Sequence, residues 1–282
     1  MARPAAPRPR PRRRLLLAAA LAPSAWCLAP SLRAQPRGAG ELLIGGTGVG
    51  LGPAARVLAP RGDVRVVPSM GSGGGIKAVQ AGAIDIALSA RPLHDAERAA
   101  GLVAQDWFRT PVAWAAHPAV PATALSLDEL LALYGGRTAR WPGGEAVRLV
   151  LRPESDSDTA LMRGIAPAAA EALRQAHARP GVLVASTDGE AVESIARLPG
   201  ALGITTLGMV LTEQPTLKVL EIDAVRPSLQ TLATGRWALV KSVRLVTRGA
   251  PAAPVRAVMD TLRSAAAGQV LAALGCQLQT AR

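Results

Sequence analysis

Short apolar runs alternate along the chain with segments in which apolar residues return every three or four positions. The runs predict strands, and several are apolar on both faces, as in sheets that helices cover on both sides. They span residues 41–46, 64–69, 84–90, 111–117, 147–152, 181–186, 201–206 and 244–249. The amphipathic segments predict helices over residues 51–60, 75–83, 126–134, 157–165, 188–198 and 254–275. This alternation predicts an α/β fold.

Two of the predicted helices carry start signals. Ser126 stands three residues before Glu129, which is the spacing of a capping box, and Gly135 follows the apolar stripe as a stop. Thr187 or Asp188 is expected to cap the helix over 188–198. These signals place polar side chains where the first helical amides lack backbone partners.

The first 34 residues have the composition of a secretory leader. They hold seven arginines and no acidic residue, then an apolar stretch over 15–22, and end in the small residue Ala34. The apolar stretch is too short to span a bilayer, so we expect a signal peptide over 1–34 rather than a transmembrane anchor. We therefore expect export to the periplasm, by the Sec route or, given Arg12 and Arg13, the twin-arginine route.

The formal net charge of +12 does not predict nucleic-acid binding. Seven of these charges lie in the leader, which leaves +5 for residues 35–282. The remaining basic residues are scattered, without the basic stripe and interleaved aromatic residues that bind nucleic acid. Cys27 would be removed with the leader, so Cys276 remains as a single cysteine without an intrachain disulfide.

Two glycine-rich turns, over residues 45–52 and 71–75, follow predicted strands and precede predicted helices. Such turns expose backbone amides at positive helix ends, where they bind oxyanions, but glycines of this kind also form plain tight turns. Neither turn has the glycine triplet of a dinucleotide site. Ala78 after Lys77 excludes a Walker-type phosphate loop.

A third turn adds side chains that suit an anion. The strand over 147–152 ends in Arg152, and the polar turn behind it opens a helix with Ser157 and Thr159. A guanidinium, two hydroxyls and first-turn amides together would bind an oxyanion. The alternative is an ordinary N-cap with Arg152 in solvent.

The segment GSGGGIKAVQAGAIDIALSARPL resembles the signature of periplasmic phosphate-binding proteins, the solute receptors of bacterial ABC phosphate importers. Further segments agree in order: LSLDELLALYGGRTARW, LPGALGI and the terminal AAAGQVLAALG. The similarity extends over residues 42–277. It implies the type 2 periplasmic-binding fold, with two lobes that close on a ligand: residues 35–115 with 206–282, and residues 116–205.

The resemblance also implies the ligand-binding residues, transferred by matching motifs: Gly50, Leu51, Ser72, Asp85, Arg152, Ser157, Asp158 and Thr159. Two positions depart from the family pattern. Gly50 replaces a threonine, so only its amide would remain for the ligand. Asp158 replaces a glycine, either as a helix-end charge that points outward or as a carboxylate that weakens or alters specificity.

The resemblance assigns Asp85 a role in selectivity. A carboxylate beside an anion is repulsive unless the ligand has a proton to donate, which phosphate has near neutral pH and sulfate lacks. Asp85 would therefore select phosphate over sulfate, and exchange of Asp85 for Asn would narrow that preference. The alternative is that Asp85 caps a turn.

The resemblance implies a non-enzymatic, monomeric protein that binds inorganic phosphate without metal or cofactor and delivers it to a membrane ABC permease. The histidines His94, His117 and His177 stand apart, and Ser72 has no nucleophile-elbow motif, so a secreted phosphate-handling hydrolase is disfavoured. A sensory or scaffolding protein with altered or lost ligand binding stays open, because Gly50 and Asp158 depart from the family pattern.

Overall fold

The computed structural model describes residues 37–279, and its centre is a sheet with the strand order β2-β1-β3-β11-β4-β8-β6-β7. Two short strands, β9 and β12, also pair with β4, and β5 pairs with β10 separately. The strands are β1 (Leu42–Gly46), β2 (Val64–Val66), β3 (Ile86–Ser89), β4 (Leu102–Ala116), β5 (Ala124–Leu125), β6 (Arg148–Leu151), β7 (Leu183–Val184), β8 (Ala201–Thr206), β9 (Lys218–Val219), β10 (Glu221–Ile222), β11 (Val240–Arg248) and β12 (Gln277–Leu278).

Strand β4 links two lobes. Its first part pairs antiparallel with β11, up to Pro111 opposite Val240, and its last five residues pair with β8, from Val112 opposite Thr206. The indole of Trp237, which lies just before β11, donates a hydrogen bond to the carbonyl of Val112 (3.0 Å) and attaches this segment to β4 where the partner strand changes. We call this place the crossing. The lobe boundaries expected from the sequence stay a prediction.

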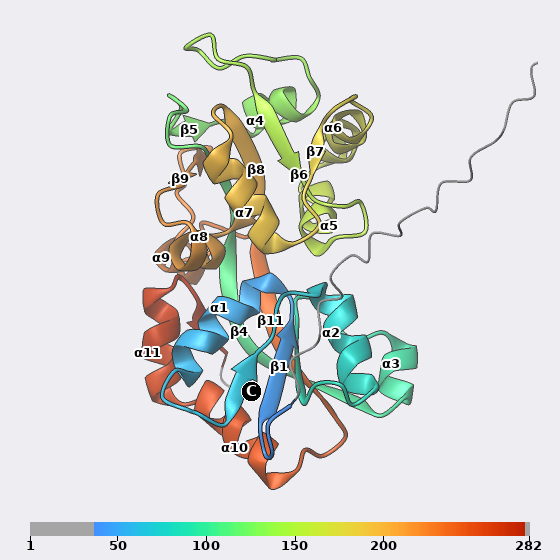
Figure 1. Cartoon of the computed structure of the whole chain (residues 1–282). Coiled ribbons are helices and arrows are strands. Elements are labelled where there is room, and N and C mark those ends of the chain that lie inside the picture. The colour runs from blue at the N-terminus through green and yellow to red at the C-terminus, as the bar shows by residue number, and fades with distance from the viewer. Residues whose placement is uncertain (1–36, 280–282) are drawn as a thin grey trace, which may run out of the picture. The chain divides into compact units, whose positions relative to one another are not determined.

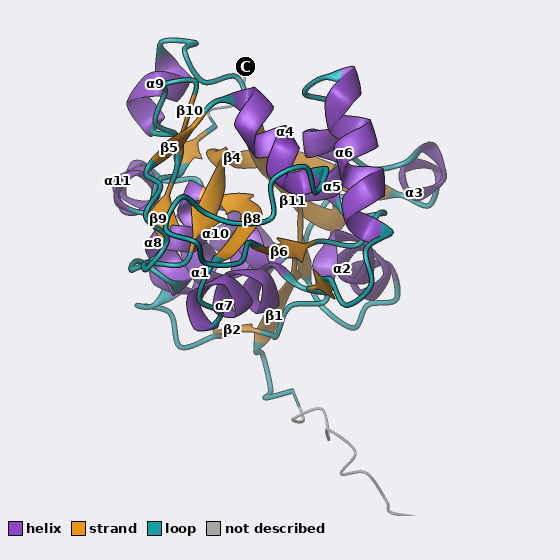
Figure 2. Cartoon of the chain, turned by 90° about the horizontal axis from the view of Figure 1, so that it is seen from above, coloured by secondary structure: helices purple, strands orange, loops and turns teal. Residues whose placement is uncertain are grey.

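Helices cover both faces of the strands (Figures 1 and 2). The first lobe has β1, β2 and β3 with α1, α2, α3, α10 and α11, and the second has β6, β7 and β8 with α4, α5, α6 and α7 (Figure 1). The helices are α1 (Gly48–Leu58), α2 (Gly71–Gln80), α3 (Asp95–Ala99), α4 (Leu127–Tyr134), α5 (Ser157–Arg163), α6 (Pro167–His177), α7 (Asp188–Arg197), α8 (Leu207–Glu213), α9 (Leu229–Ala233), α10 (Ala253–Leu262) and α11 (Ala265–Ala273).

One hydrophobic core runs through both lobes. It joins Ile44 and Val243 of the first lobe's sheet to Val150 and Ile195 of the second lobe. A second core lies under α4, α5 and α6, and a third lies under α2, around Ile76 and Val79. The sheet is therefore buried on both faces, as its two-sided apolar strands predict.

The capping signals are confirmed. Ser126 Oγ accepts a hydrogen bond from the amide of Glu129, whose carboxylate accepts one from the Ser126 amide. Thr187, rather than Asp188, caps α7 by accepting a hydrogen bond from the amide of Glu190. Asp188 is thereby left as the first residue of α7, with its side chain available for other contacts.

Some elements differ from the prediction. The terminal helix over 254–275 is two helices, because Ser264 accepts a hydrogen bond from the Ala267 amide and starts α11 anew. Helices α6, α8 and α9, the short strands β5, β9, β10 and β12, and the first half of β4 were not predicted. That half of β4 contains Gln105 and Asp106, which interrupt the apolar run.

The described residues from Ala39 to Gln279 belong to one compact unit. The predicted signal peptide lies outside the described residues. Within residues 37–279, no helix has the length and apolarity needed to span a membrane.

Candidate functional site

Arg152 follows strand β6 and is buried, with 3% of its surface exposed. Its Nη1 donates to the carbonyl of Ala185 (2.6 Å), and its Nη2 donates to Oδ2 of Asp156 (2.9 Å). Asp156 is the N-cap of α5, and its other oxygen accepts from the amide of Asp158 (2.8 Å). The guanidinium is therefore fixed in direction at the beginning of α5, and it does not lie in solvent.

Lys241 reaches the same place from the crossing. It lies in β11 opposite Thr110 of β4, and only 2% of it is exposed. Its Nζ forms an ion pair with Oδ1 of Asp158 at 2.5 Å. Asp158 therefore points inward to a cation, and its predicted alternative as an outward helix-end charge is wrong.

Asp188 connects this cluster to the first lobe. Its Oδ1 lies 3.7 Å from Arg152 Nη2 and 3.6 Å from Lys241 Nζ. Its Oδ2 accepts a hydrogen bond from the hydroxyl of Thr47 (3.1 Å), the N-cap of α1, and the amide of Gly48 also bonds this carboxylate. Two cations and the beginnings of α1 and α7 thus converge on one carboxylate.

We name Arg152, Lys241, Asp158 and Asp188 the charge cluster. It contains two cations and two carboxylates in a nearly dry environment, where charges interact strongly and desolvation is costly. Burial, and then the carboxylates of Asp188 and Asp156, raise the pKa of Asp158 to about 6 in spite of Lys241. Burial disfavours the Lys241 ammonium, but the carboxylates of Asp158, Asp188 and Asp156 outweigh it and raise the Lys241 pKa.

Asp188 responds in the opposite direction. Burial acts to raise its pKa, but Lys241, Arg152, the Thr47 hydroxyl and the Gly48 amide together lower it. Asp188 therefore stays charged further into the acid range than Asp158, whose carboxyl takes up a proton as the pH falls through about 6.

Ser72 belongs to the first lobe and is the second residue of α2. Its Oγ accepts a hydrogen bond from the amide of Ala90, which follows β3 (2.9 Å). The beginning of α2 adjoins that of α1, since the amide of Met70 donates to the carbonyl of Gly46 just before Thr47. Both glycine-rich segments therefore lie at the same end of the parallel strands, but they are not separate turns, because residues 48–52 and 71–75 are the first residues of α1 and α2.

Asp85 does not belong to this site, and its predicted contact with a shared ligand is wrong. It precedes β3, whereas Ser72 contacts Ala90 beyond the other end of that strand. At about 3.3 Å per residue, the five steps from Asp85 to Ala90 cover roughly 16 Å. The Asp85 carboxylate accepts a hydrogen bond from the amide of Leu43 in the neighbouring strand β1 (2.8 Å), so it bonds a distant part of the backbone, and the alternative that it caps a turn stays a prediction.

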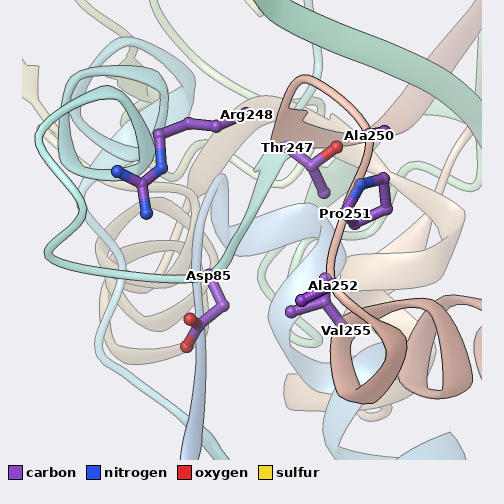
Figure 3. A pocket seen from close by; sticks show the side chains of 7 residues that line it. All are labelled: Asp85, Thr247, Arg248, Ala250, Pro251, Ala252 and Val255. Carbon is purple, nitrogen blue, oxygen red and sulfur yellow. The ribbon is translucent and has the colours of Figure 1, made fainter.

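Asp85 instead lines a surface pocket of about 350 Å³ with Thr247 and Arg248 from the end of β11 and with the start of α10 (Figure 3). Neither Ser72 nor Arg152 lines this pocket. Asp85 was predicted to select a protonated ligand, and Arg152 was predicted to bind its negative charge. These two residues thus lie in different parts of the molecule.

The other predicted residues divide between site and core. Gly50 faces the sheet, because an added Cβ would lie 2.9 Å from Leu88, and its amide donates to the carbonyl of Thr47. Leu51 packs against the main core. The predicted ligand contacts of both residues are therefore not supported. Thr159 bonds the carbonyl of Arg152 (3.2 Å), and Ser157 is the half-buried first residue of α5.

Lys241 was not predicted from the sequence, and Asp188 was predicted only as a helix cap. The signal for Lys241 was present: in β11 it shares the inward phase with Val243 and Leu245, and a lysine in an apolar phase needs a buried anion. The burial of Asp188 depends on a contact with Thr47, 141 residues away, which no local pattern reveals.

The described residues offer no metal centre, since no group of three or more His, Cys, Asp or Glu side chains there is placed to hold an ion. Cys276 is buried, and burial raises its thiol pKa to about 12.

Comparison with known proteins agrees with this picture. A family model described as a PBP superfamily domain matches residues 35–271. The Phosphate-binding protein PstS of Bacillus subtilis (strain 168) is 26% identical over 246 residues, which cover 83% of this chain and 79% of that protein.

Solved structures share the fold. A candidate phosphate ABC transporter substrate-binding protein from Clostridium perfringens, solved with bound phosphate, superposes with a TM-score of 0.70 at 17% identity, over 85% of this chain and 100% of that chain. A phosphate-binding protein from Stenotrophomonas maltophilia has a TM-score of 0.65 at 14% identity, over 85% and 91% of the two chains. The mixed α/β architecture is thus that of two-lobed binding proteins.

Proposed function

Because the chain belongs to the PBP superfamily, we propose that it is a solute-binding protein that captures inorganic phosphate for a membrane ABC importer. The observation that carries this proposal is the convergence of two buried cations. Arg152 of the second lobe and Lys241 of the crossing approach the same oxygen, Asp188 Oδ1, at 3.7 and 3.6 Å. A dry point that two cations approach is suited to an anion with several oxygens.

Further features support an oxyanion. The Nε of Arg152 is buried without a hydrogen-bond partner among the described residues, so the guanidinium keeps donor capacity. The beginnings of α1 and α7, where backbone amides carry partial positive charge, lie beside the cluster. The sequence relative named above is a phosphate-binding protein. We further propose that the protein acts in the periplasm as a monomer, after removal of residues 1–34.

Calorimetry on the purified protein tests the proposal. We expect saturable binding of inorganic phosphate and weaker binding of sulfate, because the carboxylates of Asp158 and Asp188 favour an anion that can donate a proton. The absence of heat and of a thermal shift with millimolar phosphate would overturn the proposal and favour a sensory or scaffolding protein. Release of phosphate from a chromogenic ester would instead favour a hydrolase.

A further inference from the structure

The carboxylate of Asp158 lies in the charge cluster beside a cation that the proposed ligand would also need. The Lys241 ammonium lies 2.5 Å from Asp158 but 3.6 Å from Asp188, so its close contact is with Asp158. Arg152 already has two short hydrogen bonds, to Ala185 and Asp156. Lys241 is therefore the cation whose neutralisation depends mainly on a single carboxylate.

The position of Asp158 allows a bound oxyanion to replace it as the partner of Lys241. It is the second residue of α5, next to Ser157 and Thr159, and its side chain extends toward the crossing. An oxyanion that contacted both Arg152 and Lys241 would meet the Asp158 carboxylate. Two anions in one desolvated place repel each other, so only one of them can hold Lys241 while both are charged.

We infer that Asp158 is an internal competitor of the ligand, whose carboxylate holds Lys241 in the ligand-free protein and must release it when an oxyanion binds. This inference rests on the proposed function and deepens it. Asp158 thereby sets both affinity and specificity: it weakens binding of fully ionised anions and favours an anion with a proton to share.

The groups around Asp158 determine how this competition depends on pH. Lys241 attracts its carboxylate, whereas Asp188 and Asp156 repel it, and the buried phenol of Tyr134 lies within electrostatic range. Protonation of Asp158 removes the competing charge and leaves Lys241 to the ligand. Competition should therefore be weak in acid and strong at neutral and alkaline pH.

The test is a double-mutant cycle, with phosphate affinity measured by calorimetry at pH 7.5. Asp158→Asn keeps the shape and removes the charge, and we expect it to tighten phosphate binding by about tenfold. Lys241→Met should weaken binding, and in that background Asp158→Asn should give a smaller gain, since the cation being competed for is gone. Glu193→Gln, an exposed carboxylate on α7, is the matched control and should change affinity less than about twofold.

A pH series keeps the inference testable if Lys241→Met fails to fold. The ratio of the Asp158→Asn affinity to the wild-type affinity should rise from pH 5 to pH 8, because Asp158 becomes charged and because phosphate itself loses a proton that it could share with that carboxylate. A wild-type protein that binds phosphate, with an Asp158→Asn variant that binds equally or less tightly at pH 7.5, overturns the inference and leaves the proposed function intact. If neither protein binds phosphate, the proposed function fails and the inference fails with it.

Discussion

The two lobes supply the candidate site with different kinds of groups. The first lobe contributes neutral donors, namely the Thr47 hydroxyl and the Gly48 amide at the beginning of α1. The second lobe contributes charges, namely Arg152, Asp158 and Asp188. Lys241 lies between them, at the crossing. Under the proposed function, we therefore expect the second lobe and the crossing to determine charge selectivity, while the first lobe completes the site with backbone and hydroxyl groups.

Replacement of Arg152 is expected to have the largest effect. Arg152→Met removes a buried guanidinium that accounts for several charge-assisted hydrogen bonds, so phosphate binding should weaken by at least about 100-fold. Arg152→Lys keeps the charge without the fork and should fall between wild type and Met. Arg148→Met, at the exposed first residue of β6, is the control. If calorimetry found the phosphate affinity of Arg152→Met within a few-fold of that of wild type, Arg152 would not be the residue that determines charge selectivity.

Lys241→Met is expected to lower stability most among the changes at the crossing. It leaves the buried carboxylates of Asp158 and Asp188 without their shared cation, and we expect a loss of about 3 kcal/mol in the free energy of unfolding at pH 8. Urea denaturation measures this loss. Lys77→Met, an exposed lysine on α2, is the matched control and should change little. Equal effects of the two variants would show that Lys241 is not needed to neutralise the cluster.

The pH dependence of stability should reveal Asp158 directly. Its pKa is raised from 3.8 to about 6 in the folded protein, so the folded state binds this proton more tightly than the unfolded state. The corresponding stability is complete below about pH 4 and is lost as the pH rises through about 6. Relative to Asp158→Asn, the wild type should lose about 2 kcal/mol between pH 4 and pH 7. A difference that is flat or of opposite sign would contradict the burial of a titrating carboxylate.

Gly48 tests the neutral contribution of the first lobe. A Cβ at this position would lie 2.9 Å from Asp188 Cβ and 3.0 Å from its Oδ2, so Gly48→Ala must displace the carboxylate. We expect a loss of about 1 kcal/mol in stability, measured by thermal unfolding, and weaker phosphate binding. Gly189→Ala, on α7 beside Asp188, has no atom within 4 Å of the added Cβ and should be neutral or slightly stabilising.

The sequence was sufficient for the fold class because local patterns encode it. Two-sided apolar strands predicted a sheet covered on both faces, and Ser126 and Thr187 were correctly among the predicted helix caps. The first half of β4 was missed since Gln105 and Asp106 belong to a strand whose burial depends on distant pairing with β11. Local periodicity does not contain that information.

The site was only partly predictable for the same reason. Arg152 and Asp158 follow one strand, so a local motif was enough to single them out. Lys241 joins them across 83 residues through its ion pair with Asp158, and its meaning appears only when β11 and α5 are placed together. Asp85 is the reverse case. It is close to a glycine-rich motif in sequence, but in space it lies at the opposite end of β3 from that motif.

The smallest effect is expected for replacement of Asp85. This replacement tests whether a carboxylate at the end of β3 that lies away from the charge cluster influences ligand binding. Asp85→Asn retains an oxygen that accepts from the Leu43 amide, so its stability should stay within about 0.5 kcal/mol of wild type. Asp85→Ala removes that acceptor and should cost about 1 kcal/mol. Neither change should alter the ratio of phosphate to sulfate affinity, whereas Asp158→Asn should narrow it, because the carboxylate beside the buried cations is that of Asp158. If the ratio of phosphate to sulfate affinity narrowed with Asp85→Asn and stayed constant with Asp158→Asn, Asp85 rather than Asp158 would be the residue that selects phosphate.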